Sequence, residues 1–89
     1  MDFGLTFEWD DAKSEANLAK HGVPFDVATE AFFADDLIVL EDDRRDYGEN
    51  RFIAFGTVEG FPLAVAYTVR DGIVRIISAR RQSRKERKT

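Results

Sequence analysis

Two short connections that contain glycine, Glu59-Gly60 and Asp71-Gly72, constrain the fold of this chain more than any other feature. They separate three runs rich in β-branched and aromatic residues, at 52–58, 61–69 and 73–79. Asp-Gly between two such runs is a strong signal for a tight β-hairpin, and Glu-Gly is a weaker one. Two hairpins in series predict an antiparallel β-meander. Because both faces of these strands are largely apolar, we expect the sheet to be well covered.

The sequence before residue 23 predicts a short strand and a helix. Residues 5–9 alternate apolar and polar side chains, as a half-buried strand does. Asp10 is well suited to cap the N-terminus of a helix, and Gly22 is suited to end one in a left-handed conformation. We therefore expect a helix over residues 12–20.

The next segment predicts a second helix and a further strand. Pro24 suits the first position of a helix. The core-facing side of this helix carries four apolar residues at helical spacing, Val27, Ala28, Ala31 and Phe32. The apolar run at 37–40 has the length of a strand. The predicted fold class is α+β, with an N-terminal short strand and two helices packed on the antiparallel meander, in a single domain over residues 1–89.

The charge is polarised along the chain. Residues 1–69 carry 5 basic and 15 acidic side chains, whereas residues 70–89 carry 8 basic and 2 acidic ones. The basic end, about residues 80–89, forms either a solvated tail or a short helix, for which Ser83 and Glu86 have the spacing of a capping box. A basic end of this kind attracts anionic partners such as nucleic acid.

The composition excludes several kinds of site. The chain has no cysteine, which excludes disulfides, thiolate nucleophiles and cysteine-ligated metal centres. Its single histidine argues against a histidine-based metal site. The adjacent acids at 35–36 and 41–43 are more typical of solvated carboxylates than of a cation site. We therefore expect no metal and no cofactor.

The sequence also indicates where the protein acts. No apolar run approaches the roughly 20 residues of a membrane-spanning helix. The N-terminal segment has acids where a secretory signal carries Lys or Arg, and the lack of cysteine fits a reducing compartment. We expect a cytoplasmic protein without a membrane partner.

The predicted strands contain or adjoin four arginines: Arg51, Arg70, Arg75 and Arg80. If the strand ends bring them together, their guanidinium groups can bind phosphate oxygens and stabilise a phosphorane-like transition state. The alternative is that Arg51 and Arg75 form ordinary surface ion pairs with acids such as Glu49, Glu41 or Asp42. Strand alternation also puts Arg75 and Arg80 on opposite faces. One site can use both only if the strand bulges, twists or ends before Arg80.

Two residues are candidates for proton transfer. Imidazole groups titrate near neutral pH, so His21 can act as a general acid or base. At the end of a helix it is also a common partner of the helix dipole. Glu49 stands two residues before Arg51, and it can deprotonate a hydroxyl if its loop lies over the arginines.

Several short motifs follow one another along almost the whole chain. In order, they are Phe7-Glu8-Trp9-Asp10, Lys13, Asn17, Lys20-His21-Gly22-Val23, Phe25, Ala28, Phe32-Phe33-Ala34-Asp35, Tyr47-Gly48-Glu49-Asn50-Arg51, Gly56, Arg75-Ile76-Ile77-Ser78-Ala79-Arg80 and Arg84-Lys85-Glu86-Arg87. In these motifs and their order the chain resembles the BrnT family of bacterial toxins. Pro24 is a departure, because the family often carries a small polar residue such as Ser there, and we expect no functional consequence.

The resemblance implies a toxin of a type II toxin–antitoxin system with a RelE-like ribonuclease fold. Such a protein cleaves RNA and inhibits translation. A cognate BrnA-like antitoxin blocks it, and the complex binds operator DNA only through the antitoxin. The mechanism it implies is a metal-independent attack of the RNA 2′-hydroxyl on the adjacent phosphate, which leaves a 2′,3′-cyclic phosphate.

The resemblance and the placement of the basic residues together indicate two sets of site residues. The catalytic set is His21, Glu49, Arg51, Arg75 and Arg80. The substrate-binding set is Lys20, Arg70, Arg81, Arg84 and Lys85, and Lys20 is also a candidate for proton transfer. Two other functions stay open at this point. One is a non-catalytic nucleic-acid-binding module, and the other is a protein-interaction module for an acidic or amphipathic partner.

Overall fold

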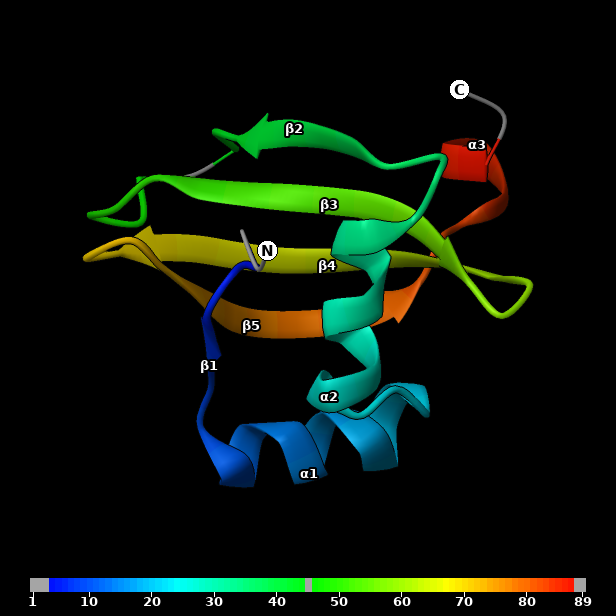
Figure 1. Ribbon diagram of the computed structural model, residues 1–89, viewed down its shortest axis with the longest axis horizontal. Helices are drawn as coiled ribbons and strands as arrows, with labels where there is room; N and C mark the ends of the chain where they lie inside the picture. Colours follow the sequence, from blue (N-terminus) through cyan, green and yellow to red (C-terminus); the bar gives the residue numbers. More distant parts are fainter. Residues whose placement is uncertain (1–3, 45, 88–89) are drawn as a thin grey trace.

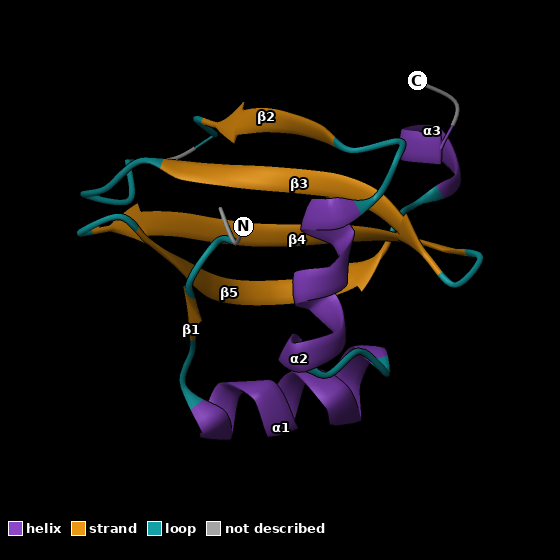
Figure 2. Cartoon of the chain, in the orientation of Figure 1, coloured by secondary structure: helices purple, strands orange, loops and turns teal. Residues whose placement is uncertain are grey.

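Within residues 4–44 and 46–87, which the computed structural model describes, the chain folds as one five-stranded sheet with short helices (Figures 1 and 2). The elements are β1 (Phe7–Glu8), α1 (Asp11–His21), α2 (Phe25–Ala28), the 3-10 helix η1 (Thr29–Phe33), β2 (Ile38–Asp42), β3 (Arg51–Val58), β4 (Phe61–Arg70), β5 (Ile73–Arg81) and α3 (Arg84–Arg87). The strand order is β1-β5-β4-β3-β2. The predicted α+β class is confirmed.

Both predicted hairpins are present. Each connection, Glu59-Gly60 and Asp71-Gly72, has two residues between paired strand ends. All four of these residues have positive φ, from 48° to 86°. Two consecutive positive φ values are typical of the type I′ turn, whose twist matches that of the flanking strands. Since β2 also pairs antiparallel with β3, β2 to β5 form the expected meander.

The N-terminal strand makes the sheet mixed rather than purely antiparallel. β1 pairs in parallel with β5, with Phe7 opposite Val74 and Glu8 opposite Arg75. The sequence predicts a strand at 5–9 but not its neighbour, because two paired residues carry too little pattern to specify a register. β1 therefore forms one edge of the sheet, and β2 forms the other.

Both predicted ends of α1 are confirmed. Asp10 accepts hydrogen bonds from the backbone N–H groups of Ala12 at 2.9 Å and Lys13 at 3.2 Å. Gly22 has a φ of 75° and donates its N–H to the carbonyl of Leu18 at 2.8 Å. These contacts are a side-chain N-cap and a left-handed C-cap.

Asn17 ties α1 to the sheet. This residue is 8% exposed. Its Nδ2 donates to the carbonyls of Val23 and Ala79, both at 2.7 Å, and its Oδ1 accepts from the N–H of Ala79 at 3.2 Å. The helix is thereby fixed against the C-terminal half of β5.

The second predicted helix is divided into α2 and η1. Pro24 is the N-cap of α2 instead of its first helical residue. The predicted core face is confirmed, because Ala28, Ala31 and Phe32 are buried. A Cβ atom on Gly56 of β3 would lie 2.5 Å from the carbonyl oxygen of Ala31. Glycine at this position allows η1 to pack directly on the sheet.

The two faces of the sheet differ in cover, contrary to the expectation that both are well covered. Alternate residues of β3, including Ala54 and Val58, are buried in the core formed with the helices. On the opposite face, Ile38 and Leu40 of β2 remain 53% and 55% exposed. The reason is that the long helical segment between β1 and β2 crosses one face only (Figure 2). We call the opposite face the open face.

Candidate functional site

A β-bulge brings Arg75 and Arg80 together on the open face. The pairing between β4 and β5 slips by one residue at Ile77, which has no direct partner in β4. As a result, Arg75 lies opposite Thr68 and Arg80 opposite Ala64, two β4 residues that share a face. The alternation of a regular strand would have separated the two arginines. A bulge was one of the conditions under which both can serve one site.

Two further arginines lie on the same face. Arg51 of β3 is opposite Thr68, which is in turn opposite Arg75 of β5. Because neighbouring strands are about 4.8 Å apart, the Cα atoms of Arg51 and Arg75 are separated by roughly 10 Å. Arg70 follows Thr68 by two residues in β4 and shares its face. We call Arg51, Arg70, Arg75 and Arg80 the open-face arginines.

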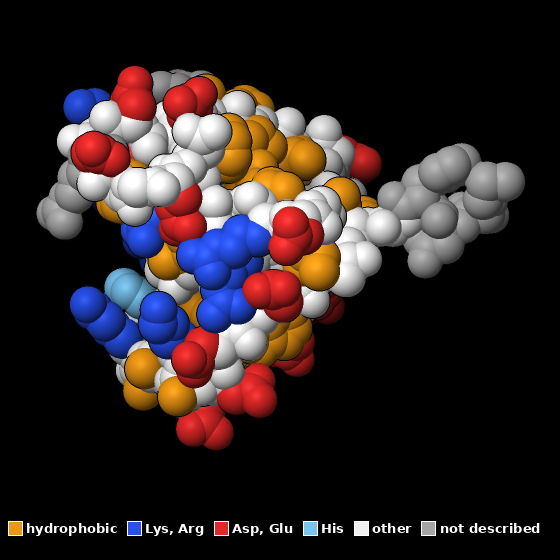
Figure 3. All heavy atoms as spheres, turned by 90° about the vertical axis from the view of Figure 1, so that its left-hand side faces the viewer, with side chains coloured by type: hydrophobic (Ala, Val, Ile, Leu, Met, Phe, Trp, Pro, Cys, Tyr) orange, Lys and Arg blue, Asp and Glu red, His pale blue; other side chains and the backbone are white. Residues whose placement is uncertain are grey.

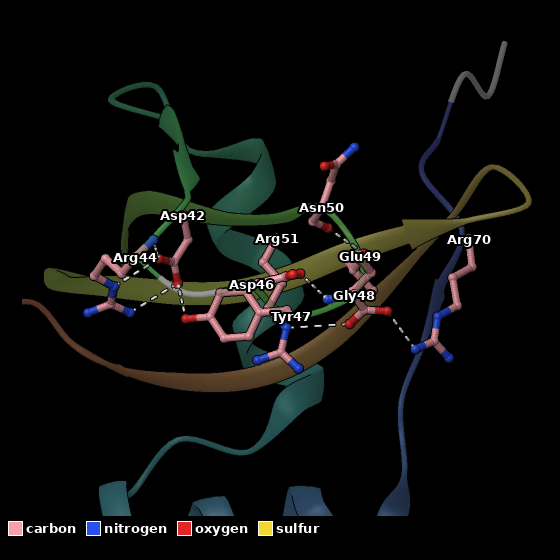
Figure 4. Close-up of polar contacts among 10 residues, drawn as sticks. Asp42, Arg44, Asp46, Tyr47, Gly48, Glu49, Asn50, Arg51 and Arg70 are labelled. Carbon is pink, nitrogen blue, oxygen red and sulfur yellow. Dashed lines mark hydrogen bonds and ion pairs between the residues drawn. The ribbon is translucent and has the colours of Figure 1, made fainter.

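Glu49 joins two of these arginines (Figure 4). It accepts a hydrogen bond from Arg70 at 2.8 Å and a longer one from Arg51 at 3.4 Å. The hydrogen bond from Arg70, with a smaller contribution from Arg51, holds the pKa of Glu49 below its usual value. A carboxylate with a lowered pKa is a weaker base. In this state Glu49 is better suited to hold the two arginines than to take a proton.

The other two open-face arginines are also bound to carboxylates. Arg75 donates to Glu8 at 2.6 Å. Arg80 donates a bidentate pair of hydrogen bonds to the carboxylate of Glu86, at 2.7 and 2.9 Å. The alternative of ordinary ion pairs is thus realised in the structure, although Arg75 pairs with a residue of β1 rather than with the acids suggested by the sequence.

The basic C-terminal segment forms the short helix α3, one of its two predicted conformations. Ser83 and Glu86 make the reciprocal contacts of a capping box, at 2.8 and 3.2 Å. Arg80, and to a smaller extent Ser83, lower the pKa of Glu86 to about 2. The last part of the predicted tail, residues 88–89, lies outside the described residues.

Lys20 and His21 lie far from Glu49 along the sheet. They end α1, and the next residue, Gly22, lines a hollow of about 210 Å³ together with Arg81. Arg81 is paired near the β3–β4 hairpin, whereas Glu49 contacts Arg70 at the β4–β5 hairpin, the other end of β4. Within the described chain no hydrogen bond or ion pair joins His21 to Glu49 or to an open-face arginine. The structure therefore does not bring the two proton-transfer candidates together.

The remaining three predicted substrate-binding residues are spread out. Arg81 lies opposite the core residue Leu63, so it belongs to the helix-covered face. Arg84 and Lys85 are exposed on α3. Lys85 lines a groove of about 550 Å³ whose apolar wall includes Leu40. Among the described residues of the predicted set, the open-face arginines share one face of the sheet. Arg51, Arg70 and Arg75 lie toward the β4–β5 hairpin with Glu49, whereas Arg80 lies toward the other end of β4.

Two residues without a predicted catalytic role support this end of the sheet, Asp42 and Tyr47 (Figure 4). Asp42 belongs to an acidic run expected to be solvated, yet it is 8% exposed and bound by Arg44 at 2.8 Å. That hydrogen bond is the main cause that lowers the pKa of Asp42 to about 2. The ring of Tyr47 lies under the guanidinium of Arg51. The only sequence signal for Tyr47 was its place in the motif that ends at Arg51.

One side of the molecule carries a visible patch of positive charge (Figure 3). Viewed from the side of the β4–β5 hairpin, Lys and Arg side chains form a central patch with Asp and Glu beside them (Figure 3). The family described as the ribonuclease toxin BrnT of type II toxin–antitoxin systems matches residues 9–86.

The chain belongs to the BrnT family.

A search of curated proteins finds no match. As a BrnT protein, the chain is a ribonuclease toxin of a type II toxin–antitoxin system, which implies an RNA substrate and an antitoxin partner. The matched segment contains all four open-face arginines and Glu49, whereas Glu8 lies just before it. Among the described helices of this BrnT protein, none is long and apolar enough to cross a bilayer.

Proposed function

We propose that this BrnT protein is a cytoplasmic endoribonuclease with a RelE-like fold, which cleaves RNA without a metal ion and thereby inhibits translation. The observation that carries the proposal is the gathering of Arg51, Arg75 and Arg80 on a sheet face that α1, α2 and η1 leave open. An RNA strand can reach such a face. Guanidinium groups bind phosphate oxygens through two parallel N–H donors and keep their charge at any relevant pH.

In the proposed reaction the RNA 2′-oxygen attacks the adjacent phosphorus and the bond to the 5′-oxygen breaks. The products are a 2′,3′-cyclic phosphate and a 5′-hydroxyl. The 2′-hydroxyl gives its proton to a base, and the leaving 5′-oxygen takes one from an acid. The transition state carries more negative charge on the phosphoryl oxygens than the substrate does, so Arg80 and Arg75 stabilise it more than they stabilise bound RNA.

The candidates for proton transfer in this reaction differ in their surroundings. Glu49 is ionised and held by two arginines, which makes it a weak base. His21 is exposed and lies far from Glu49, so it can serve only if RNA extends to the end of α1. Lys20 lies beside it and is the third candidate. We propose that Arg70, Arg81, Arg84 and Lys85 bind RNA away from the reacting phosphate.

Substrate binding must exchange carboxylates for phosphates. Each open-face arginine holds a glutamate at 3.4 Å or less. An RNA phosphate offers the same two-oxygen geometry as a carboxylate. The proposed site is therefore formed before RNA arrives, and it opens as Glu8, Glu49 or Glu86 is displaced.

A cognate BrnA-like antitoxin is the proposed inhibitor, and operator DNA is bound only through that antitoxin. The support is the family itself, together with the charge difference between residues 1–69 and 70–89. An antitoxin that covers the basic end would compete with RNA for the same charges.

The test is cleavage of total RNA by purified, antitoxin-free protein in EDTA. The variants are Arg80→Ala, His21→Ala and Lys13→Ala, of which the last removes an exposed cation of α1 as a matched control. We expect cleavage by the wild type and the control, and a loss of about a hundredfold for Arg80→Ala. A rate for Arg80→Ala within a few fold of wild type would rule out its transition-state role. The His21 variant decides whether that residue moves protons.

Translating ribosomes are added in a second arm of the experiment. Cleavage only in this arm keeps the proposed function and assigns ribosome dependence. Intact RNA in both arms overturns it in favour of the two other functions. A nucleic-acid-binding module would then bind RNA in a salt-dependent way, with similar losses for each arginine removed. A protein-interaction module would bind one partner tightly and have no affinity for RNA.

A further inference from the structure

Arg51 is held differently from the other open-face arginines. Its guanidinium carbon lies 4.1 Å from the centre of the Tyr47 ring (Figure 4). Among the residues that the structure describes, its side chain donates one hydrogen bond, from Nε to Glu49 at 3.4 Å. By contrast, the terminal nitrogens of Arg75 and Arg80 are bound to carboxylates at 2.6–2.9 Å.

The difference matters because the two kinds of contact use different parts of the guanidinium group. An aromatic ring attracts the flat face of the group, whereas carboxylates and phosphates bind its N–H edge. Contact with the Tyr47 ring therefore restrains the guanidinium group of Arg51 without a hydrogen bond to its terminal N–H groups. The Arg51 side chain is 30% exposed, so this edge can be reached from solvent.

Tyr47 is itself held in place. Its hydroxyl donates a hydrogen bond to Asp42 at 3.2 Å. The Asp42 side chain is only 5% exposed and accepts two further bonds from the side chain of Arg44, at 2.8 and 3.0 Å. Asp42 is the last residue of β2 and lies directly opposite Arg51 in β3. A buried carboxylate on a strand thus fixes a loop residue against a neighbouring strand.

We infer that Tyr47 is a positioning residue for Arg51, and that Asp42 acts through Tyr47 by anchoring its hydroxyl. The ring orients the guanidinium so that its terminal N–H groups face the RNA phosphate. The inference rests on the proposed function for its effect on cleavage, but the positioning itself is a property of the free protein. Tyr47 and Asp42 are not catalytic residues, since neither needs to touch RNA.

The kinetic test is a double-mutant cycle between Tyr47 and Arg51. Tyr47→Leu removes the aromatic face, and Tyr47→Phe keeps it. We expect Tyr47→Leu to lower kcat/KM for RNA cleavage by about tenfold and Tyr47→Phe, which keeps the ring but loses the anchored hydroxyl, by about threefold. In an Arg51→Ala background, Tyr47→Leu should change the rate by less than about twofold, because the residue it acts through is gone. Equal effects of Tyr47→Leu in both backgrounds would overturn the inference.

Asp42→Asn is a second, less disruptive variant that tests the anchor. It keeps the size of the side chain but weakens its hold on the Tyr47 hydroxyl. We expect a loss of about threefold in the wild type and no further loss in Tyr47→Phe, which has no hydroxyl to anchor. An equal loss in both backgrounds would show that Asp42 does not act through Tyr47.

A spectroscopic test needs no RNA. The Nε–H signal of Arg51 in a proton–nitrogen NMR spectrum is expected to be displaced by the ring current of Tyr47, to keep this displacement in Tyr47→Phe and to lose it in Tyr47→Leu. The matched control is Phe61→Leu, since Arg81 stacks on Phe61 at 4.5 Å elsewhere in the molecule. This control should move the Arg81 signal and leave that of Arg51 unchanged.

The two tests separate the inference from the proposed function. If the wild type cleaves no RNA, the proposed function fails, and the NMR comparison still decides whether Tyr47 positions Arg51. If the wild type cleaves RNA while the Arg51 signal is the same with and without the aromatic ring, the inference fails and the proposed function stands.

Discussion

Arg75 and Arg80 of β5 point to the same face of the sheet although five positions separate them. Regular alternation places residues an odd number of positions apart on opposite faces. The extra residue, Ile77, shifts the alternation by one position. Arg80 therefore lies on the same face as the arginines of the neighbouring strands. The composition of the site thus depends on one irregularity in backbone pairing.

The bulge predicts that the fold tolerates the deletion of one residue in β5. Removal of Ile77 should convert the bulge into a regular ladder and leave Arg75 and Arg80 on one face, because four positions then separate them. We expect the deletion variant to fold and to cleave RNA within about fivefold of wild type, as measured by circular dichroism and the cleavage assay.

The matched control deletes Ala66, the β4 residue next to the slip. The ladder between β4 and β3 is regular at this position, so the deletion moves the core residue Tyr67 to the open face. We expect no folded protein. Loss of folding on deletion of Ile77 as well would show that the bulge is required for the sheet itself.

Release of Arg80 from Glu86 should favour RNA. Glu86→Gln replaces a carboxylate bound at 2.7 and 2.9 Å by a neutral amide, so a phosphate displaces it more easily. We expect RNA to bind about three- to tenfold more tightly, as measured by fluorescence anisotropy with a labelled oligonucleotide. Glu30→Gln is the control, because it makes the same charge change at an exposed residue of η1. Equal gains in both variants would indicate a general charge effect.

The same pair makes stability depend on acid pH. The pKa of Glu86 is lowered from 4.5 to about 2, mainly by Arg80. As the pH falls, the Glu86 carboxylate therefore takes up a proton at a higher pH in the unfolded chain than in the folded protein. The stabilising effect of the pair is complete above pH 4.5 and is lost as the pH falls toward 2. Urea unfolding between pH 7 and pH 2 should show a smaller acid loss of stability for Glu86→Gln than for wild type. Identical profiles would contradict the assignment.

Asn17→Ala should destabilise the fold rather than the chemistry. The substitution leaves the buried carbonyls of Val23 and Ala79 and the N–H of Ala79 without their side-chain partner. We expect a loss of about 2–4 kcal/mol in the free energy of unfolding, measured in urea. Asn50→Ala, at an exposed loop position, serves as the control and should cost less than about 0.5 kcal/mol. A similar small cost for Asn17→Ala would show that water replaces these bonds.

The features that the sequence predicted well are local ones. The Asp71-Gly72 turn and the cap at Asp10 depend on the conformational preferences of a few adjacent residues. The core face of α2 and η1 follows from helical spacing in the same way. These features need no knowledge of distant parts of the chain.

The features that the sequence missed depend on pairing between distant residues. The parallel partner of β1 and the bulge at Ile77 are properties of strand register, which no single strand specifies. The two proton-transfer candidates, His21 and Glu49, share suitable chemistry but lie far apart along the sheet. The link between Asp42 and Tyr47 was hidden because an acid in an acidic run gives no indication that it is buried.

The glutamates on the open-face arginines also change what happens to small ions when RNA binds. A free cationic surface is surrounded by mobile anions, and a polyanion gains affinity at low salt as condensed ions are released. Here the compensating charges are covalently attached to the protein, so they change partners without entering solution. Affinity for RNA should then vary with ionic strength less steeply than four arginines would suggest, and stray contacts with other cellular polyanions should be weak.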